Sequence, residues 1–484
     1  MASSVREYPE LFIGGVWTAP SDGTWLDTVN PASGQVWARV AVAGPRDVDA
    51  SVERARAALR GPWSEMSPSE RGDVLMRLAD LLERDKDRLA RLETTDNGKP
   101  ISDTAREIGR AARWLRYYAG AADKICGRQV PVGRKALAYT QRVPVGVVAA
   151  ITPWNSPLYL YSWKLGPALA AGNCVLLKPA EQTPVTALEL ARLASEAGLP
   201  EGVLSVVPGT GPDIGRYLIG HPGVNKVAFT GETSTAAAIL RGAADDLKRV
   251  TCECGGKAPN IVFGDADLDK AIPVSVHSAF RSTGQSCAAA SRLFVQDTIY
   301  EDVLERISAR VRDLRVDLPE RPSTEVGPQT SAEQLEKTLS YISLGQQEGA
   351  RLVAGGARPS NPELSEGYFV EPTVFADVDN RWRLAQEEIF GPVLSVIPFS
   401  DEDAAVAAAN DTKYGLVAGL WTSDVSRAIR VAHQIEAGLV SVNTFRPVHW
   451  SLPYGGWKRS GIGRENGMEA LDEYTELRTI YIEL

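Results

Sequence analysis

A thiol and a carboxylate stand out among the residues that can do chemistry. Cys287 ends the segment Gly284–Cys287 and lies beside small residues that leave a thiol accessible. Glu253 lies 34 positions earlier (287 − 253 = 34) in the segment Glu253–Lys257, whose two glycines let backbone approach a ligand closely. A nucleophilic cysteine with a base is what covalent catalysis through a thioester requires. We therefore take this pair as the candidate catalytic centre.

Composition limits the class of protein. A chain of 484 residues is too long for one hydrophobic core, so we expect two or three domains. Apolar residues make up 44% and charged residues 23%, which is typical of a soluble globular enzyme. The 52 basic and 61 acidic residues give a net charge of −9, and no basic run occurs, so nucleic acid is not an expected partner.

The cysteines and the amino-terminal stretch bear on location. Five cysteines is an odd number, which argues against a disulfide framework and favours a reducing compartment. Residues 1–10 lack the apolar segment of a secretory signal, and no apolar run reaches the roughly 18–20 residues of a membrane span. We expect a cytoplasmic protein without membrane association.

The elements that must position the pair follow from hydrophobic periodicity. Residues 67–98 show the clearest helical pattern, which opens with a capping box at Ser67 and Glu70 and ends at Gly98. From 143 to 250, short β-branched runs alternate with Ala/Leu-rich segments, which predicts a parallel sheet with crossover helices. The predicted strands are 145–151, 174–177, 203–207 and 224–229, and the predicted helices are 165–171, 185–197 and 212–219.

A second α/β region is predicted from 260 to 450. Its strands are expected near 261–263, 293–295, 393–397 and 439–442, and its helices near 299–314, 331–348, 402–409 and 424–436. Residues 476–484 alternate apolar and polar side chains, which predicts a terminal strand. Such a strand needs a partner, and either an internal edge or a neighbouring subunit can supply it.

Several segments that follow the predicted strands can bind a ligand, although each also has an ordinary structural explanation. Gly209–Gly215 suits a phosphate-binding turn before a helix, or a plain strand-to-helix turn. Glu181 can accept both hydroxyls of an adenosine ribose, or lie in a solvated charged loop. Asn155 can donate to a developing oxyanion, or satisfy its own turn.

Metal chemistry and cysteine–histidine hydrolysis are not indicated. The four histidines are scattered without ligand spacing, and Cys252-x-Cys254 has no second pair, so no metal site is expected. A hydrolase of the papain type needs a histidine near Cys287, and no sequence feature places one there.

These segments occur together and in the order of the aldehyde dehydrogenase superfamily, which the chain resembles from about Phe12 to its carboxyl end. The matching segments are Pro153–Asn155, Lys178–Glu181, Phe229–Gly231, Glu253–Lys257, Gly284–Cys287, Glu388–Pro392 and Pro453–Glu465. The resemblance implies an α/β fold with a Rossmann-type NAD-binding domain, an α/β catalytic domain and a small β oligomerisation element. Their expected ranges are 1–120 with 143–254, then 255–454, and 121–142 with 455–484.

The resemblance also implies a mechanism. Cys287 would attack the aldehyde, and the Asn155 amide with the backbone N–H of Cys287 would hold the oxyanion. Glu253 would activate the water that hydrolyses the thioester. Lys164 and Glu465 match positions proposed to pass protons outward, although an ordinary salt bridge or solvated charges would explain them equally well.

An NAD site is implied as well. Lys178 and Glu181 match the adenosine ribose contacts, and a carboxylate there repels a 2′-phosphate, which favours NAD over NADP. The other expected cofactor residues are Ile151, Trp154, Gly211, Gly215, Phe229, Gly231, Glu232, Cys254, Gln334, Lys337, Glu388 and Phe390. Glu232 stands where serine is common, and because its charge would repel a pyrophosphate we expect it to point away. Cys254 replaces a common leucine and is expected to be a small core residue.

The aldehyde path is implied only in outline. Its expected residues are Ser156, Leu160, Trp163, Ser286, Ala288, Phe445, Arg446, Val448 and Tyr454. Arg446 could bind the carboxylate of a semialdehyde, or form a salt bridge at the surface or at a subunit interface. The aromatic residues suit a planar or aliphatic chain. A homodimer or homotetramer is expected, and the rivals are a CoA-acylating enzyme, which generally lacks the hydrolytic glutamate, and a non-catalytic family member.

Overall fold

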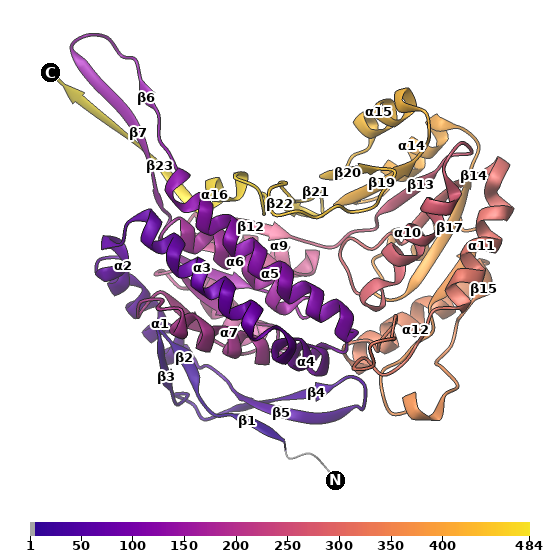
Figure 1. Ribbon diagram of the computed structural model, residues 1–484, viewed down its shortest axis with the longest axis horizontal. Helices are drawn as coiled ribbons and strands as arrows, with labels where there is room; N and C mark the ends of the chain where they lie inside the picture. Colours follow the sequence, from indigo (N-terminus) through magenta and orange to yellow (C-terminus); the bar gives the residue numbers. More distant parts are fainter. Residues whose placement is uncertain (1–4) are drawn as a thin grey trace.

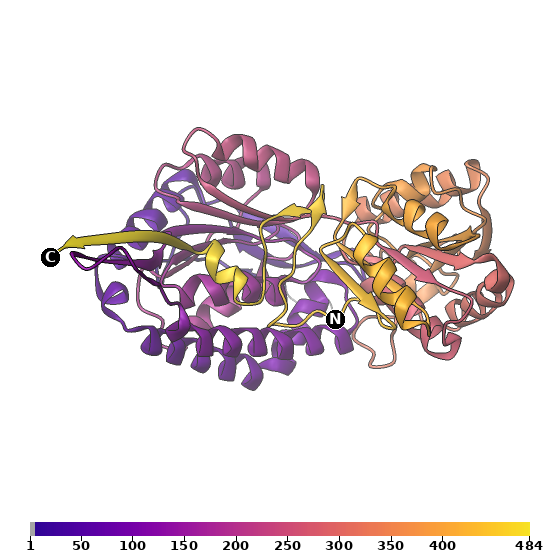
Figure 2. The ribbon, with the colours of Figure 1, turned by 90° about the horizontal axis from the view of Figure 1, so that it is seen from above.

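A computed structural model describes residues 5–484, so the first four residues of the predicted signal-free stretch lie outside the described part. Two α/β lobes, each built on its own sheet, lie side by side, and a narrow sheet projects from one of them (Figures 1 and 2). Within residues 5–484 no helix has the length and apolar character needed to cross a membrane.

The first lobe contains an eight-stranded sheet in the order β22-β12-β11-β8-β9-β10-β2-β3. Neighbouring strands from β12 to β10 pair in parallel, whereas β22, β2 and β3 are antiparallel. The strands are β2 (Leu11–Ile13), β3 (Val16–Thr18), β8 (Val147–Ile151), β9 (Cys174–Lys178), β10 (Leu204–Val206), β11 (Lys226–Thr230), β12 (Arg249–Glu253) and β22 (Gly461–Ile462). A smaller sheet is formed by β1 (Arg6–Tyr8), β5 (Gln35–Ala41) and β4 (Trp25–Asn30).

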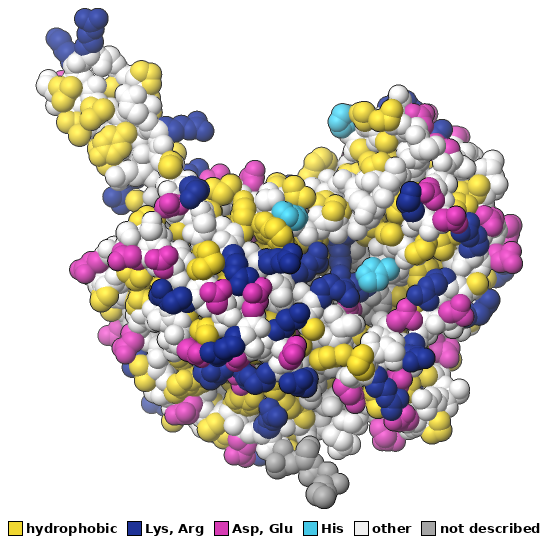
Figure 3. Space-filling model, viewed as in Figure 1, with side chains coloured by type: hydrophobic (Ala, Val, Ile, Leu, Met, Phe, Trp, Pro, Cys, Tyr) yellow, Lys and Arg dark blue, Asp and Glu magenta, His cyan; other side chains and the backbone are white. Residues whose placement is uncertain are grey.

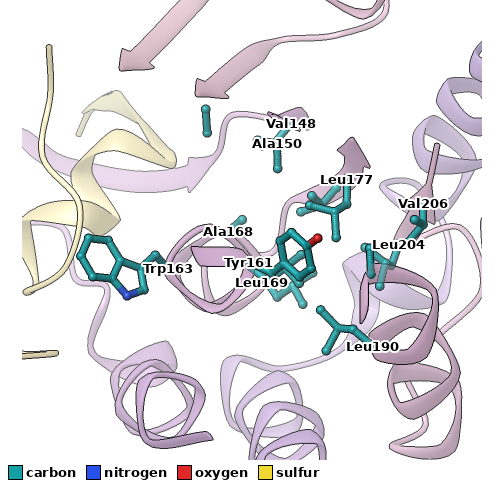
Figure 4. Packing of buried hydrophobic residues seen from close by; sticks show 14 of the residues in the cluster. Val148, Ala150, Tyr161, Trp163, Ala168, Leu169, Leu177, Leu190, Leu204 and Val206 are labelled. Carbon is teal, nitrogen blue, oxygen red and sulfur yellow. The ribbon is translucent and has the colours of Figure 1, made fainter. Parts of the chain in front are cut away.

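Helices cover both faces of the large sheet. They are α1 (Pro45–Ala58), α2 (Pro62–Glu65), α3 (Pro68–Arg84), α4 (Lys86–Asn97), α5 (Ile101–Ala121), α6 (Pro157–Ala170), α7 (Val185–Glu196), α8 (Arg216–Gly220) and α9 (Thr233–Ala243). Every residue of β8, β9 and β11 is therefore buried, as expected for parallel strands. Tyr161 of α6 points toward Leu177 and Leu190, and Trp163 leaves the opposite side of the same helix (Figure 4).

The second lobe contains a seven-stranded sheet in the order β15-β16-β17-β14-β13-β19-β20. Its strands are β13 (Pro259–Val262), β14 (Arg292–Gln296), β15 (Arg351–Ala354), β16 (Thr373–Ala376), β17 (Val393–Phe399), β19 (Val417–Trp421) and β20 (Leu439–Val442). Its helices are α10 (Leu268–Phe280), α11 (Tyr300–Arg312), α12 (Ala332–Gln347), α13 (Arg383–Gln386), α14 (Glu402–Asn410) and α15 (Val425–Gln434). The predicted α/β class is confirmed.

The carboxyl-terminal region runs across both lobes. β21 (Trp457–Lys458) pairs with β18 (Tyr414–Gly415), β22 extends the first sheet, and α16 (Glu469–Glu473) leads into β23 (Thr475–Glu483). β23 pairs antiparallel with β7 (Ala136–Pro144), which also pairs with β6 (Gln129–Val130), and this sheet is the projecting arm (Figure 1). The terminal strand therefore has an internal partner, and one of its edges stays open within the described chain. The predicted domain ranges remain predictions.

Three local predictions differ from the structure. The helix predicted over 67–98 is broken at Asp85, whose carboxylate accepts hydrogen bonds from Arg84, Arg88 and Arg192. The helix predicted from 165 begins at Pro157, because a proline at the first helical position needs no N–H partner. The segment predicted as a helix over 212–219 opens with a π-turn before α8.

Candidate active site

The carboxyl ends of four parallel strands bring the first lobe's site residues together. β8, β9, β11 and β12 pair in register, with Ile151 opposite both Lys178 and Phe229, and Thr230 opposite Glu253. Since parallel strands end at one edge of a sheet, the loops after them form a crevice there. Asn155, Glu181, Gly231 and Glu253 lie at these ends.

The nucleophile comes from a tightly folded loop of the second lobe. Ser282 and Thr283 adopt left-handed φ values of 54° and 57°, and Gly284 follows with 69°. A Cβ on Gly284 would lie 2.2 Å from the carbonyl oxygen of Gly391, so only glycine fits there. The Thr283 hydroxyl donates to the carbonyl of Gly327 at 3.1 Å, which fixes the turn that presents Cys287.

Asn155 and the nucleophile loop are joined directly. The Asn155 side-chain amide donates to the carbonyl of Gln285 at 3.0 Å. Gln285 precedes Cys287 by two residues, so this bond holds the amide beside the nucleophile loop. The backbone N–H of Cys287 donates to no group within residues 5–484. The two predicted oxyanion donors thus belong to one hydrogen-bonded unit, with the Cys287 N–H still available.

Glu253 is buried at the end of β12, and its Oε2 has no hydrogen-bond partner among the described residues. Burial raises its pKa well above the usual value, the Glu465 carboxylate adds to the rise, and the Lys164 ammonium opposes it. A carboxylate with a raised pKa is a stronger base, as a group that must deprotonate water requires.

Lys164 and Glu465 form a fully buried ion pair behind Glu253. Lys164 also donates to the Thr230 hydroxyl at 2.8 Å, while Glu465 Oε2 is buried and unpaired within the described chain. Lys164 and Glu465 are therefore a buried salt bridge and not two solvated charges. Whether they pass protons stays a prediction.

A cavity of about 480 Å³ joins the two lobes at the strand ends. Cys287, Asn155, Glu253 and Leu160 all line it. The expected cofactor residues on its wall are Trp154, Gly231, Glu232, Cys254, Gln334, Lys337, Glu388 and Phe390. The sequence therefore predicted most of one continuous wall from segments that lie up to 236 positions apart (390 − 154 = 236).

The remaining cofactor candidates lie at the strand ends, off that wall. Lys178 is buried, and its ammonium is 3.6 Å from the half-exposed Glu181 carboxylate. A Cβ on Gly215 would lie 3.7 Å from Lys178 Cε, so the π-turn that includes Gly211 packs against this lysine. Ile151 and Phe229 are buried neighbours in the sheet.

Glu388 and Phe390 close the cavity from the second lobe. Glu388 accepts a hydrogen bond from the backbone N–H of Gly256 at 3.0 Å, and burial raises its pKa to about 7. A Cβ on Gly255 would lie 1.9 Å from the Glu388 carboxylate, so a larger residue there would have to displace this carboxylate. Phe390 packs edge-to-face on Trp154 with centroids 5.2 Å apart, which clamps the two lobes together.

Glu232 and Gln334 differ in what holds them. Glu232 was expected to point away from a pyrophosphate, and this stays a prediction: the exposed residue lies at the cavity wall, where its charge helps to raise the pKa of Glu388. It precedes α9 without capping it, so no local hydrogen bond turns the carboxylate aside. The Gln334 amide donates to the carbonyls of Ile389 and Phe390, both at 3.0 Å, and so supports the clamp.

Some of the expected substrate residues contact the nucleophile loop directly or through one neighbour, and others pack in the core or bond to a different segment. Tyr454 places its hydroxyl 4.0 Å from Cys287 Sγ, Trp163 packs on Tyr454 at 5.2 Å, and Arg446 donates to the Ser286 hydroxyl. Ala288 and Phe445 are buried in the main hydrophobic cluster. Ser156 accepts a hydrogen bond at 2.9 Å from the buried Lys99, and the Val448 carbonyl accepts one from Arg110.

Sequence reasoning missed Lys99, Arg110 and Thr230, which contact three of the expected residues. Lys99 lies just before α5 and Arg110 lies within it, a helix that the sequence analysis did not predict. Thr230 was visible as the middle residue of Phe229–Gly231. Within residues 5–484 no group of three His, Cys, Asp or Glu side chains could hold a metal.

The Cys287 thiol gives a pH prediction. Burial raises its pKa to about 11, although the Arg446 guanidinium opposes the rise. The thiolate fraction therefore grows about tenfold per pH unit from pH 7 to 9 in the cofactor-free protein. Alkylation of the Cys287 peptide by iodoacetamide, followed by mass spectrometry, should show this slope. A rate that levels off near pH 7 would mean that the thiolate is already formed, against this expectation.

Comparison with known proteins agrees with this geometry. The family model described as "Aldehyde dehydrogenase family" matches residues 17–480. An aldehyde dehydrogenase of Emericella nidulans is 45% identical over 475 residues, which cover 98% of this chain and 95% of that protein. The structure of a Bacillus cereus aldehyde dehydrogenase with NAD+ superimposes with a TM-score of 0.96 at 42% identity, covering 99% of this chain and 97% of that one.

A second structure extends the similarity to a protein with a named substrate. An indole-3-acetaldehyde dehydrogenase in complex with NAD+ has a TM-score of 0.97 at 42% identity and covers 100% of this chain and 98% of that chain. The relatives match over nearly their full length, and the ordered segments around Cys287 and Glu253 fall inside the matched range. The chain belongs to the aldehyde dehydrogenase family.

Proposed function

We propose that this chain uses NAD to oxidise an aldehyde to a thioester on Cys287, and that water then hydrolyses the thioester to the carboxylic acid. One observation carries the proposal: Cys287, Asn155, Glu253 and Glu388 line a single cavity of about 480 Å³ between the lobes. A nucleophile, an oxyanion donor and a base of raised pKa in one cavity are the groups that acyl transfer needs.

Each residue has a defined role in the reaction. The Cys287 thiolate adds to the aldehyde carbon, and the oxyanion accepts hydrogen bonds from the Asn155 amide and the Cys287 N–H. Bound NAD would supply the hydride acceptor, so that loss of hydride from that carbon would leave a thioester on Cys287. Glu253 takes a proton from the attacking water, and the acid leaves as the Cys287 thiolate is released. The buried Lys164–Glu465 pair then offers a route for that proton.

The residues present fit NAD. Lys178 and Glu181 stand at the end of β9 in the position that suits adenosine ribose hydroxyls, and Glu181 disfavours the 2′-phosphate of NADP. No side chain caps the amino end of α9, so its first-turn N–H groups are open to a phosphate. Lys337 lies on the same cavity wall as Glu232 and brings a positive charge to it. Two related structures with NAD+ support the same cofactor.

An aldehyde panel tests the proposal. Aliphatic, aromatic and carboxylated aldehydes are mixed with NAD or NADP, with and without CoA, and NADH or NADPH is followed by absorbance. We expect NAD to be preferred and CoA to have no effect, because Glu253 supplies water as the acyl acceptor. NADH formation that depends on CoA would make this a CoA-acylating enzyme, and no NADH with any aldehyde would favour a non-catalytic family member.

We also propose that the protein is a homodimer or homotetramer joined through the projecting arm. β23 is the open edge of the arm and exposes Leu477 and Tyr481, which lie on one face of the strand. β20 is one of the two edges of the second lobe's sheet and offers a partner for a strand from a second copy. The five cysteines, all unpaired, fit the cytoplasmic location that we propose.

The arm gives a prediction about assembly. Replacing both Leu477 and Tyr481 with Ser removes apolar area from one face and should lower the mass to that of a monomer in light scattering after gel filtration. Arg478→Ser, on the other face of β23, is the matched control and should keep the oligomer. If the double variant keeps the oligomer too, the interface lies elsewhere.

A further inference from the structure

Arg446 is held next to the nucleophile without a counter-charge. Its backbone has a left-handed φ of 50°, and its guanidinium donates to the hydroxyl of Ser286, the residue before Cys287. The side chain is partly buried and forms no ion pair within residues 5–484. A salt bridge inside this chain is therefore not the reason for this arginine.

A second arginine approaches the same loop from α5. Arg110 donates to the Val448 carbonyl at 3.5 Å and likewise has no ion pair among the described residues. Burial raises the pKa of the Tyr159 hydroxyl, and the positive charges of Arg110 and Arg446 both oppose this rise. We call Arg110 and Arg446 the arginine pair.

The other cations nearby are already neutralised. Lys99 and Arg281 pair with Glu107, and Arg281 also contacts Asp103 at 3.2 Å. The arginine pair thus retains its positive charge in a partly desolvated setting, where an unpaired charge is costly and an anionic ligand is favourable. Lys and Arg side chains also gather along α5 at the junction of the lobes, so the approach to this region is positive (Figure 3).

Aromatic rings lead from the nucleophile toward the arginine pair. Tyr454 contacts Cys287, Trp163 packs on Tyr454, and Trp114 stacks on Trp163 at 5.8 Å. Tyr159, whose pKa both arginines lower, packs on Trp114 with ring centroids 5.1 Å apart. We call these four buried rings the aromatic wall, and they form the packed apolar side of the region that links Cys287 to the arginine pair.

We infer that the substrate is an aldehyde that also carries a carboxylate, and that the arginine pair binds this carboxylate while the aromatic wall holds the body between the two groups. The inference rests on the proposed function and narrows it to one substrate class. A guanidinium recognises a carboxylate through two parallel N–H bonds, which an uncharged amide of the same shape cannot reproduce.

A rival role for Arg446 makes a different prediction. Its charge also favours the thiolate form of Cys287, so it could serve the nucleophile and ignore the substrate. Loss of a thiolate stabiliser would slow carboxylated and neutral aldehydes equally. Loss of a carboxylate contact would slow the carboxylated aldehyde more, so the ratio of the two rates separates the roles.

The test compares 4-formylbenzoate with 4-formylbenzamide, and 5-oxopentanoate with 5-oxopentanamide. In the wild type we expect kcat/KM to be at least about tenfold higher for each carboxylate than for its amide, and Arg446→Gln to reduce this ratio at least about tenfold. Arg110→Gln should reduce it less, and Arg446→Lys should restore part of it. Arg113→Gln, an exposed arginine one turn along α5, is the control and should leave the ratio within about twofold.

A second measurement does not depend on turnover. Terephthalate should protect Cys287 from iodoacetamide at a lower concentration than terephthalamide, and Arg446→Gln should abolish the difference. Equal rate ratios in wild type and Arg446→Gln, or equal protection by both compounds, would overturn the inference while leaving the aldehyde dehydrogenase activity in place. Absence of oxidation of all four aldehydes would count against the proposed function, and the protection result would then decide the carboxylate site by itself.

Discussion

Glu253→Gln should slow steady-state turnover by about 10²–10⁴-fold and leave an acyl group on Cys287. The amide has the shape of the carboxylate but cannot accept a proton from water, whereas Cys287 and Asn155 remain in place to form the thioester. The raised pKa of Glu253, caused by burial and by the Glu465 carboxylate, is what equips it for this step. The defect should therefore lie in deacylation.

Two readouts separate that defect from a general loss of activity. Rapid mixing with aldehyde and NAD should still give a burst of NADH of about one equivalent per site, and mass spectrometry should find the Cys287 peptide heavier by the acyl group. Cys287→Ala is the control and should give neither burst nor adduct. Normal turnover with an unmodified peptide would show that another group activates water.

The same variant distinguishes the acyl acceptor. A small thiol or amine added to Glu253→Gln should restore turnover, because it attacks the thioester without needing a base of high pKa. CoA should do no better than a simple thiol of similar pKa, since this proposal gives CoA no binding role. Strong rescue by CoA alone would revive the acylating alternative.

Asn155 and Glu253 were predictable from the sequence as neighbours because each lies at a strand end. A parallel sheet brings the carboxyl ends of its strands to one edge, so Asn155 after β8 and Glu253 ending β12 must be near each other once the alternation of strands and helices is seen. The same reasoning predicted the α/β class. It requires only hydrophobic periodicity, which is a local property of the chain.

What escaped prediction depends on contacts between distant segments. The break at Asp85 depends on Arg192, which lies 107 positions later on α7. Arg110 of α5 contacts the carbonyl of Val448, which lies 338 positions later in the chain. Helical periodicity indicates that one face of a helix is buried, but not which segment of the chain packs against that face.

Asn155→Ala should lower kcat by about 10²–10³-fold, because it removes one of two donors to the oxyanion. The Asn155 amide is tied to the carbonyl of Gln285, and the Cys287 N–H lies two residues further along the same loop. A donor held in advance by the fold costs nothing to reorganise when charge develops on oxygen. Its loss therefore acts on the step that forms the tetrahedral adduct, and the burst of NADH should slow by the same factor as kcat.

A matched variant tests whether this loss is specific to the oxyanion. Asn173 is also a buried amide of the first lobe and donates to the carbonyls of Ala168 and Tyr474 at 3.0 and 2.9 Å, away from Cys287. Asn173→Ala should lower the Tm, because two buried carbonyls each lose one donor and the Gly146 N–H loses its acceptor, and should change the burst rate less than about threefold. Asn155→Ala should show the opposite pattern, with a slow burst and a smaller change in Tm. If both variants slow the burst equally, the effect of Asn155 is exerted through the packing of the lobe, and the backbone N–H of Cys287 must stabilise the oxyanion without it.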